Sequence, residues 1–140
     1  IDLLETEGLD NVYARHHRIA EGVRRAIAAW GMKPCAASAD LYSDTVTAVV
    51  VPDGFNGTDV VKLAAEKYGV AFGVGLGEVA GKVFRIGHLG SLTDVMMLAG
   101  LATAEMCMAD LSYPIKLGSG VAAAQDYYRQ SGAKAAKAAA

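Results

Sequence analysis

Hydrophobic residues recur at steps of three and four from Leu9 to Trp30, with arginine and glutamate between them, a pattern typical of an amphipathic helix. Gly31 follows this pattern directly, and Pro34 comes shortly after it. Glycine suits the left-handed conformation at a helix end, and proline cannot continue a helix. We therefore predict one long helix over residues 1–31.

The middle of the chain switches between strand and helix patterns. Residues 45–51 are almost all β-branched and are followed by a Pro-Asp-Gly turn, which indicates a strand. Helical spacing returns over residues 58–68 and stops at Gly69. Residues 70–74 and 82–87 then alternate with period two on either side of a glycine-rich stretch. We expect these two runs to pair as a β-hairpin.

Two further helices are predicted in the last third of the chain. Residues 91–94 have the S-x-x-D form of a capping box, and the apolar run over residues 95–108 fits a helix that starts there. Residues 118–131 form another amphipathic pattern, and the Ala/Lys-rich tail, residues 133–140, is expected to be disordered. Together the elements predict an α+β fold, with helices covering one face of a small, mostly antiparallel sheet. Residues 1–132 are expected to form one domain.

Composition narrows the possible partners. Hydrophobic residues make up 53% of the chain, so we expect a partner to cover some apolar surface. The formal charge is −2 and basic residues do not cluster with aromatic ones, which argues against nucleic acid. The apolar runs are far shorter than the roughly 18 residues of a membrane span. Because the chain begins at Ile1, inside a helical pattern, we expect it to be part of a longer protein.

Cysteine and histidine spacing does not indicate a metal site. Cys35 and Cys107 are isolated and lack CxxC spacing, so we interpret them as reduced, buried thiols of a cytoplasmic protein. His16 and His17 are adjacent, and on a helix they would point about 100° apart, so that they could not share one metal ion. The chain also lacks the G-x-S-x-G elbow that presents a serine nucleophile.

Residues 75–80 match the letters of the G-x-G-x-x-[GA] motif of dinucleotide-binding proteins. In those proteins the motif ends a strand and begins a helix, because the phosphates bind at the helix N-terminus. A strand pattern follows the motif in this chain instead. We therefore interpret residues 75–80 as a flexible turn.

Arg85 lies within residues 83–87, a stretch otherwise suited to a buried strand. Burying a guanidinium group is costly unless a carboxylate meets it. Such an arginine can bind the carboxylate of a small α-keto or α-amino acid through two parallel hydrogen bonds. Alternatively, it can form an internal salt bridge or reach water from an edge strand. The pattern alone favours the structural alternatives.

Residues 77–90 read GEVAGKVFRIGHLG. They resemble the G-x-x-x-G-K-x-[FW]-R-I-G-x-L-G segment of class V aminotransferases, the group that contains serine–glyoxylate and alanine–glyoxylate aminotransferases. The resemblance extends over nearly the whole chain, to about Gly132. It identifies the chain as the C-terminal small domain of a pyridoxal-phosphate-dependent enzyme of fold type I.

The resemblance also implies a function and a site. Arg85 takes the place of the family's arginine that binds the substrate α-carboxylate, which outweighs the structural alternatives. The implied reaction moves an amino group from serine, alanine or aspartate to glyoxylate, in a homodimer, on pyridoxal phosphate held by a large domain that precedes this segment. We therefore expect no catalytic, cofactor-binding or metal-binding residue in this chain, and no activity of the chain alone. The lysines that are not assigned to the cofactor are Lys33, Lys62, Lys67, Lys82 and Lys116.

Two alternative functions stay open. The chain could be a free-standing module that binds small carboxylates through Arg85 without catalysis. It could also be an oligomerisation domain whose methionine-rich helix forms an adaptable contact face, although core packing is the favoured use of those methionines. The methionines of that helix are Met96, Met97, Met106 and Met108.

Overall fold

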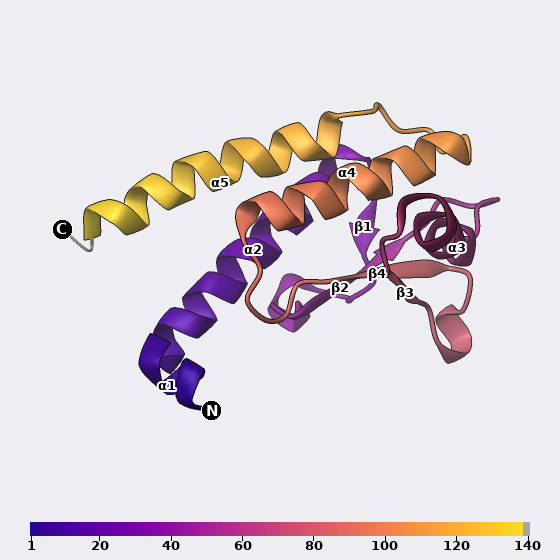
Figure 1. Ribbon diagram of the computed structural model, residues 1–140. Helices are drawn as coiled ribbons and strands as arrows, with labels where there is room; N and C mark the ends of the chain where they lie inside the picture. The colour runs from indigo at the N-terminus through magenta and orange to yellow at the C-terminus, as the bar shows by residue number, and fades with distance from the viewer. Residues whose placement is uncertain (139–140) are drawn as a thin grey trace.

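A computed structural model describes residues 1–138 of the chain, with the side chains of residues 1–131. Helices and strands follow one another from the N-terminus to the C-terminus in the arrangement shown in Figure 1. Two single-turn 3-10 helices, η1 and η2, lie in the connections. The elements are α1 (Asp2–Glu7), α2 (Leu9–Ala29), β1 (Lys33–Pro34), η1 (Ala39–Leu41), β2 (Val46–Val50), α3 (Gly57–Tyr68), β3 (Gly73–Val74), η2 (Gly77–Val79), β4 (Val83–Gly87), α4 (Asp94–Asp110) and α5 (Ser119–Ala138).

The four strands form one antiparallel sheet in the order β1-β2-β4-β3. Val49 pairs with Phe84, and Ala48 pairs with Arg85. Because successive side chains of a strand point to opposite faces, Val49 and Phe84 lie on one face of the sheet and Arg85 on the other. The predicted antiparallel sheet and the hairpin between β3 and β4 are confirmed, with β3 shorter than the predicted run.

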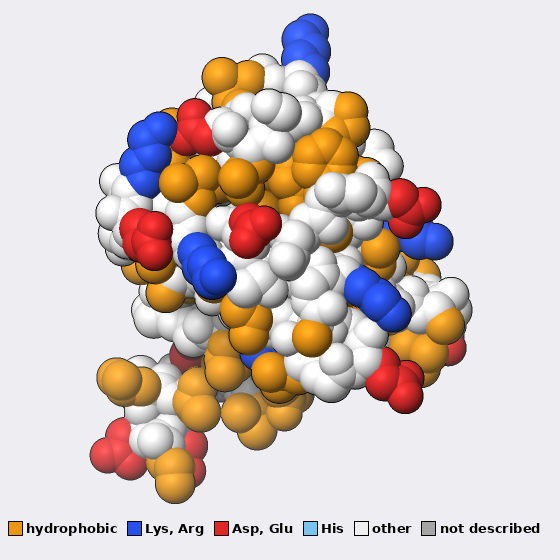
Figure 2. Space-filling model, turned by 90° about the vertical axis from the view of Figure 1, so that its right-hand side faces the viewer, with side chains coloured by type: hydrophobic (Ala, Val, Ile, Leu, Met, Phe, Trp, Pro, Cys, Tyr) orange, Lys and Arg blue, Asp and Glu red, His pale blue; other side chains and the backbone are white. Residues whose placement is uncertain are grey.

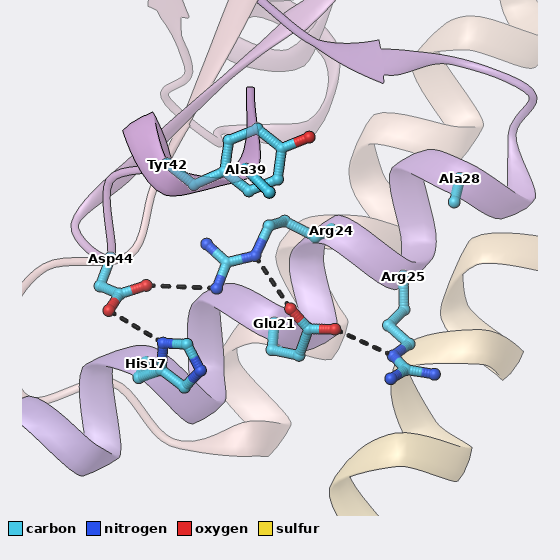
Figure 3. A pocket seen from close by; sticks show the side chains of 8 residues that line it. All are labelled: His17, Glu21, Arg24, Arg25, Ala28, Ala39, Tyr42 and Asp44. Carbon is cyan, nitrogen blue, oxygen red and sulfur yellow. Dashed lines mark hydrogen bonds and ion pairs between the residues drawn. The ribbon is translucent and has the colours of Figure 1, made fainter. Parts of the chain in front are cut away.

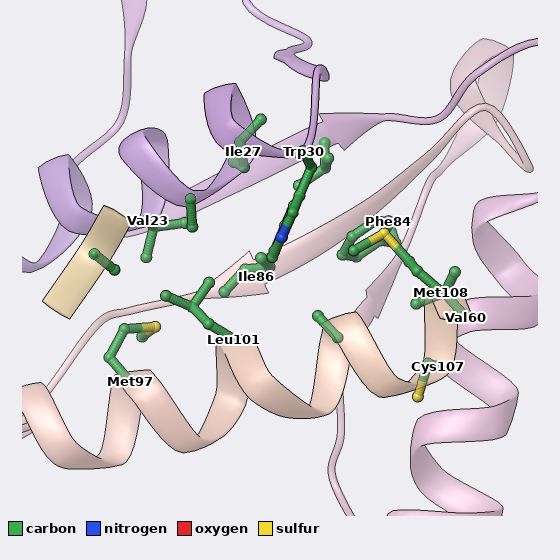
Figure 4. Close-up of a cluster of buried hydrophobic side chains, with 14 of the residues drawn as sticks. Val23, Ile27, Trp30, Val60, Phe84, Ile86, Met97, Leu101, Cys107 and Met108 are labelled. Carbon is green, nitrogen blue, oxygen red and sulfur yellow. The ribbon is translucent and has the colours of Figure 1, made fainter. Parts of the chain in front are cut away.

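Helices α2, α3 and α4 cover the Phe84 face of the sheet, and α5 packs along α2 and α4 (Figure 1). Figure 4 shows side chains from all three covering helices and β4 meeting in one core. Ile27, Phe84, Leu101 and Met108 are completely buried there. Burying a side chain of this size contributes about 1.5–3 kcal/mol, so the sheet and its helices stabilise one another. The predicted α+β class, with one covered face, is confirmed.

Local details differ from the sequence predictions. The long helix predicted over residues 1–31 is interrupted at Gly8, whose φ of 81° is accessible to glycine and breaks the helical path between α1 and α2. The capping residue of α4 is Thr93 rather than Ser91, since the Thr93 side chain accepts a hydrogen bond from Met96 N. Strand β1 was not predicted. Part of the predicted tail, residues 139–140, lies outside the described residues.

The methionines of helix α4 differ in burial, and the core packing favoured for them holds for two of the four. Met97 and Met108 are buried in the core, whereas Met96 is 54% exposed and Met106 is 36% exposed. Within residues 1–138, no helix has the combination of length and apolarity that crossing a membrane requires.

Candidate functional site

Arg85 lies at the centre of β4 on the open face of the sheet, between Ala48 of β2 and Gly73 of β3. Both neighbours are small, and a Cβ atom on Gly73 would lie only 3.0 Å from Arg85 Nε. The guanidinium group therefore has room to lie across the sheet. Its Nε donates a hydrogen bond to Val74 O at 2.9 Å, which orients the side chain.

The terminal nitrogens of Arg85 have no hydrogen-bond acceptor among the described residues, and no described carboxylate lies within ion-pair distance of them. The internal salt bridge considered for Arg85 is therefore absent from this part of the chain. The Arg85 residue as a whole is half-buried. A carboxylate would satisfy both terminal nitrogens at once.

A small cavity of about 150 Å³ lies beside Arg85 on this face. Since a water molecule occupies about 30 Å³, the space suits a molecule of a few heavy atoms. Strand β2 contributes Ala48, and the connection between β1 and β2 contributes Cys35 and Tyr42. Arg24 reaches the cavity from α2. The cavity thus combines one arginine with free donors, one thiol and a wall of small or aromatic side chains.

The two cysteines differ in their surroundings. Cys107 is completely buried, as predicted, and burial raises the pKa of its thiol. Cys35 is exposed, so the prediction that it is buried was wrong. It directly follows the short strand β1 and lines the Arg85 cavity, because Cys35 N donates to Ala48 O at 2.8 Å and holds the residue at the sheet edge.

A second cavity, of about 590 Å³, shares Arg24 and Tyr42 with the Arg85 cavity, and Figure 3 shows the residues that line it. Arg24 Nε donates to Glu21 Oε2 at 3.0 Å, and Arg24 Nη2 donates to Asp44 Oδ1 at 3.2 Å. Asp44 Oδ2 lies 3.0 Å from His17 Nδ1. Arg24 therefore has carboxylate partners on two sides, unlike Arg85.

Two histidines, His88 and His16, make hydrogen bonds in this region. His88 is buried, and its Nε2 and Nδ1 lie within 3.0 Å of Thr47 Oγ1 and Asp44 O. Burial lowers the pKa of His88, so the ring is neutral near pH 7. His16 Nε2 accepts a hydrogen bond from Gly90 N at 3.0 Å. Both rings are occupied with backbone or hydroxyl partners, and no three potential metal ligands cluster among the described residues.

The five lysines whose side chains the structure describes do not fit a Schiff base to pyridoxal phosphate. They are exposed, whereas such a lysine needs a pKa lowered by burial or by a neighbouring cation. Lys67 shows the opposite, because its ion pair with Asp110, at 2.7 Å, raises its pKa. The lysines concerned are Lys33, Lys62, Lys67, Lys82 and Lys116.

Sequence reasoning singled out Arg85 but not the residues around it. Arg24 was assigned to a solvated helix face, and Tyr42 and Asp44 lie in a connection with no periodic pattern. The sequence carried no signal that this connection crosses the open face of the sheet. Contacts between α2 and the connection, which are distant in sequence, bring these side chains to Arg85.

Comparisons with known proteins point to one family. The chain is 66% identical over 134 residues to an L-aspartate–glyoxylate aminotransferase of Paracoccus denitrificans. The aligned residues make up 96% of the chain and 34% of that enzyme. It is 51% identical over 138 residues to a serine–glyoxylate aminotransferase of Hyphomicrobium methylovorum, covering 99% of the chain and 34% of the enzyme. The chain thus spans about one third of the length of these relatives. No protein-family model matches it.

A solved structure agrees with these sequence relatives. The pyridoxamine–pyruvate aminotransferase of Mesorhizobium loti superposes with a TM-score of 0.86 at 34% identity, over 93% of this chain and 33% of that one. The sequence alignments and the structural superposition therefore each cover nearly the whole chain and about one third of the longer protein. Over nearly its whole length, the chain is therefore similar to about one third of the class V pyridoxal-phosphate-dependent aminotransferases.

Proposed function

We propose that the chain is the substrate-carboxylate-binding small domain of an aminotransferase that moves an amino group from an amino acid to glyoxylate. The observation that carries the proposal is Arg85, which is half-buried beside a small cavity and whose terminal nitrogens have no acceptor among the described residues. The relatives act on glyoxylate with aspartate or serine, according to their names. Both kinds of substrate carry the α-carboxylate that Arg85 would bind.

Arg85 would act by orientation. Its Nε is held by Val74 O, so the fork of the two terminal nitrogens has a defined direction before a ligand arrives. A carboxylate bound by two parallel hydrogen bonds has its plane and position set together. Amino donor and glyoxylate share this group, so one arginine serves both substrates. Holding the substrate in a reactive orientation lowers the entropic part of the barrier.

Pyridoxal phosphate supplies the group that carries the amino nitrogen between the two substrates when it is bound. Within residues 1–131, whose side chains are described, the lysines do not fit this cofactor, because each of them is exposed. We therefore propose that the cofactor is held by a large domain of the same enzyme, in the two thirds that the relatives have beyond this chain.

The exposed apolar side chains support a partner for this domain. Leu41, Leu76 and Leu89 are each more than 60% exposed, at 63%, 64% and 69%. Figure 2 shows hydrophobic side chains gathered in patches between charged ones on one face of the molecule. Covering such patches is favourable by about 25 cal/mol per Å². We propose the large domain and a second copy of the enzyme as the partners, in the cytoplasm, where thiols such as Cys35 stay reduced.

Cys35 offers a direct test of carboxylate binding beside Arg85, because it is exposed and lines the same cavity. Iodoacetate carries a carboxylate and iodoacetamide does not, while both alkylate the same thiol. We expect Arg85 to draw iodoacetate to Cys35, so that the rate ratio of iodoacetate to iodoacetamide falls about tenfold in Arg85→Gln. Oxalate should protect Cys35 from alkylation in the chain without a substitution and fail to protect it in Arg85→Gln.

Lys33→Gln is the matched control, since Lys33 is exposed, lies two residues from Cys35 and is not part of the cavity wall. Removing its charge should leave the rate ratio nearly unchanged. Mass spectrometry of the alkylated peptide measures both rates. An identical ratio in the unmodified chain and in Arg85→Gln would show that Arg85 does not bind carboxylates here, and the proposal would be wrong.

A further inference from the structure

Residues 36–45, in the connection between β1 and β2, form one wall of the Arg85 cavity, and we call them the wall segment. At the end of the segment, His88 N donates to Thr45 O at 2.9 Å and His88 Nδ1 lies 3.0 Å from Asp44 O. Over residues 36–43 the backbone hydrogen bonds are local, such as Tyr42 N to Ala39 O at 3.2 Å, and residues 36–41 are exposed. The position of residues 36–43 against the sheet therefore depends on side-chain contacts.

Arg24 of α2 makes three contacts with the wall segment, and Figure 3 shows it between Tyr42 and Asp44 of this segment. Its guanidinium carbon lies 5.5 Å from the centre of the Tyr42 ring. Its Nη1 donates to Ser43 O at 3.4 Å and its Nη2 to Asp44 Oδ1 at 3.2 Å. The Arg24 side chain is only 10% exposed, so water screens these contacts weakly.

We infer that Arg24 is a positioning residue, which holds the wall segment in place and thereby shapes the cavity where Arg85 meets a substrate carboxylate. This inference rests on the proposed function of Arg85. Leu41, Tyr42 and Ser43 of the segment line the cavity together with Arg85. When Tyr42 and Ser43 are held by Arg24, the opposite wall lies at a fixed distance from Arg85.

Arg24 also lines the cavity, yet it is not a second carboxylate-binding residue. Glu21 and Asp44 already occupy its Nε and Nη2. A substrate carboxylate would have to displace one of these two acidic side chains. The donors of Arg85, in contrast, are free among the described residues. The two arginines therefore have separate roles, since Arg85 binds and Arg24 positions.

An arginine suits this role better than a lysine. The planar fork reaches a carboxylate, a backbone carbonyl and an aromatic face at the same time, which the single ammonium of lysine cannot do. His17 also contacts Asp44, but its side chain is 64% exposed and it touches neither Tyr42 nor Ser43 in the described contacts. His88 holds only the end of the segment, at Asp44 and Thr45. Losing Arg24 should therefore release residues 36–43 of the wall segment even though His17 and His88 stay.

The test compares Arg24→Gln and Arg24→Lys with Arg25→Gln in the 140-residue chain. Arg25 is the matched control, because it is the neighbouring arginine, is 54% exposed and pairs with Glu21 without contacting the wall segment. Hydrogen exchange of the amides of residues 36–45 measures how firmly the segment is held. Protection of Cys35 by oxalate measures the affinity of the cavity for a carboxylate.

We expect Arg24→Gln to speed exchange in the wall segment and to weaken oxalate protection, each by about tenfold. Arg24→Lys should show smaller changes than Arg24→Gln in segment exchange and in oxalate protection, and Arg25→Gln should change neither quantity. Exchange in β4 should stay slow in every variant. Unchanged exchange of the segment in Arg24→Gln, or faster exchange with unchanged oxalate protection, would overturn the inference. If oxalate failed to protect even the unmodified chain, the proposed function of Arg85 would be wrong, and exchange would still decide whether Arg24 anchors the segment.

Discussion

Arg85 and Glu105 are charged side chains within apolar stretches, and they differ in how many of their polar atoms have hydrogen-bond partners. Glu105 of α4 is only 2% exposed. Its carboxylate accepts hydrogen bonds from Trp30 Nε1 at 2.8 Å and from Gly118 N and Gly120 N at 2.6 Å. These donors lie at the start of α5 and the end of α2, so the buried carboxylate joins three helices. Arg85 keeps free donors and is available for a ligand, whereas Glu105 is fully used within the fold.

Replacing Glu105 by alanine should lower the free energy of unfolding by roughly 3 kcal/mol, because several buried donors would lose their acceptor. Urea denaturation of the chain measures this change. Glu66→Ala is the matched control, since Glu66 is an exposed glutamate inside helix α3 and its loss should cost less than about 0.5 kcal/mol. Equal effects of the two substitutions would show that the Glu105 contacts contribute little.

At the scale of elements, the packing of α5 against α2 depends on one glycine. A Cβ atom on Gly22 of α2 would overlap the ring of Tyr128 in α5. Tyr128 also donates its hydroxyl hydrogen to Ile19 O at 2.7 Å, and burial raises its pKa above the ordinary value. The aromatic ring therefore lies directly on the α2 backbone, which a larger residue would prevent.

Gly22→Ala should destabilise the chain by roughly 2 kcal/mol, although alanine is the better helix former, because the added methyl group forces α5 away from α2. Gly100→Ala in α4 should do the opposite. A Cβ atom there meets no atom within 4 Å, so the gain in helix propensity of about 0.5–1 kcal/mol should appear as added stability. Urea denaturation of both variants measures the two signs, and stabilisation by Gly22→Ala would contradict the packing argument.

At the scale of the whole molecule, the domain has an arginine that we propose to orient the substrate, and within residues 1–131 it has no lysine that fits the cofactor. It spans about one third of the relatives that it matches, 34% of the first two. Its exposed leucines, such as Leu76 and Leu89, are available for the remaining two thirds. The chemistry and the binding of the carboxylate are thus divided between domains in our proposal.

The purified 140-residue chain should therefore show no amino transfer from serine or aspartate to glyoxylate in the presence of pyridoxal phosphate. Its visible absorption should show no band from a Schiff base on the protein that disappears with the amino donor. The enzyme that contains the chain together with a large domain should show both, and serves as the positive control. Turnover by the chain alone would disprove the division between domains.

Much of the fold could be predicted from local patterns. The spacing of the apolar residues was sufficient to predict helices α2, α3, α4 and α5, because each helix packs one apolar side against a common core. Period two was sufficient for β4 and for its pairing with β3. The R-I-G-x-L-G segment around Arg85 was sufficient for the family, since its resemblance is specific and extends over nearly the whole chain.

Contacts between distant residues decided the rest. Strand β1 has two residues and contains a proline, so it has no period of its own and exists through its pairing with Val49 and Val50. Cys35 is exposed because that pairing places it at the edge of the open face. The partners of Arg85 and Arg24 come from other elements, and a sequence pattern encodes which face a side chain takes but not which side chain it meets there. The period of the apolar residues indicates which side of each element is buried, whereas the site depends on how the elements are packed together.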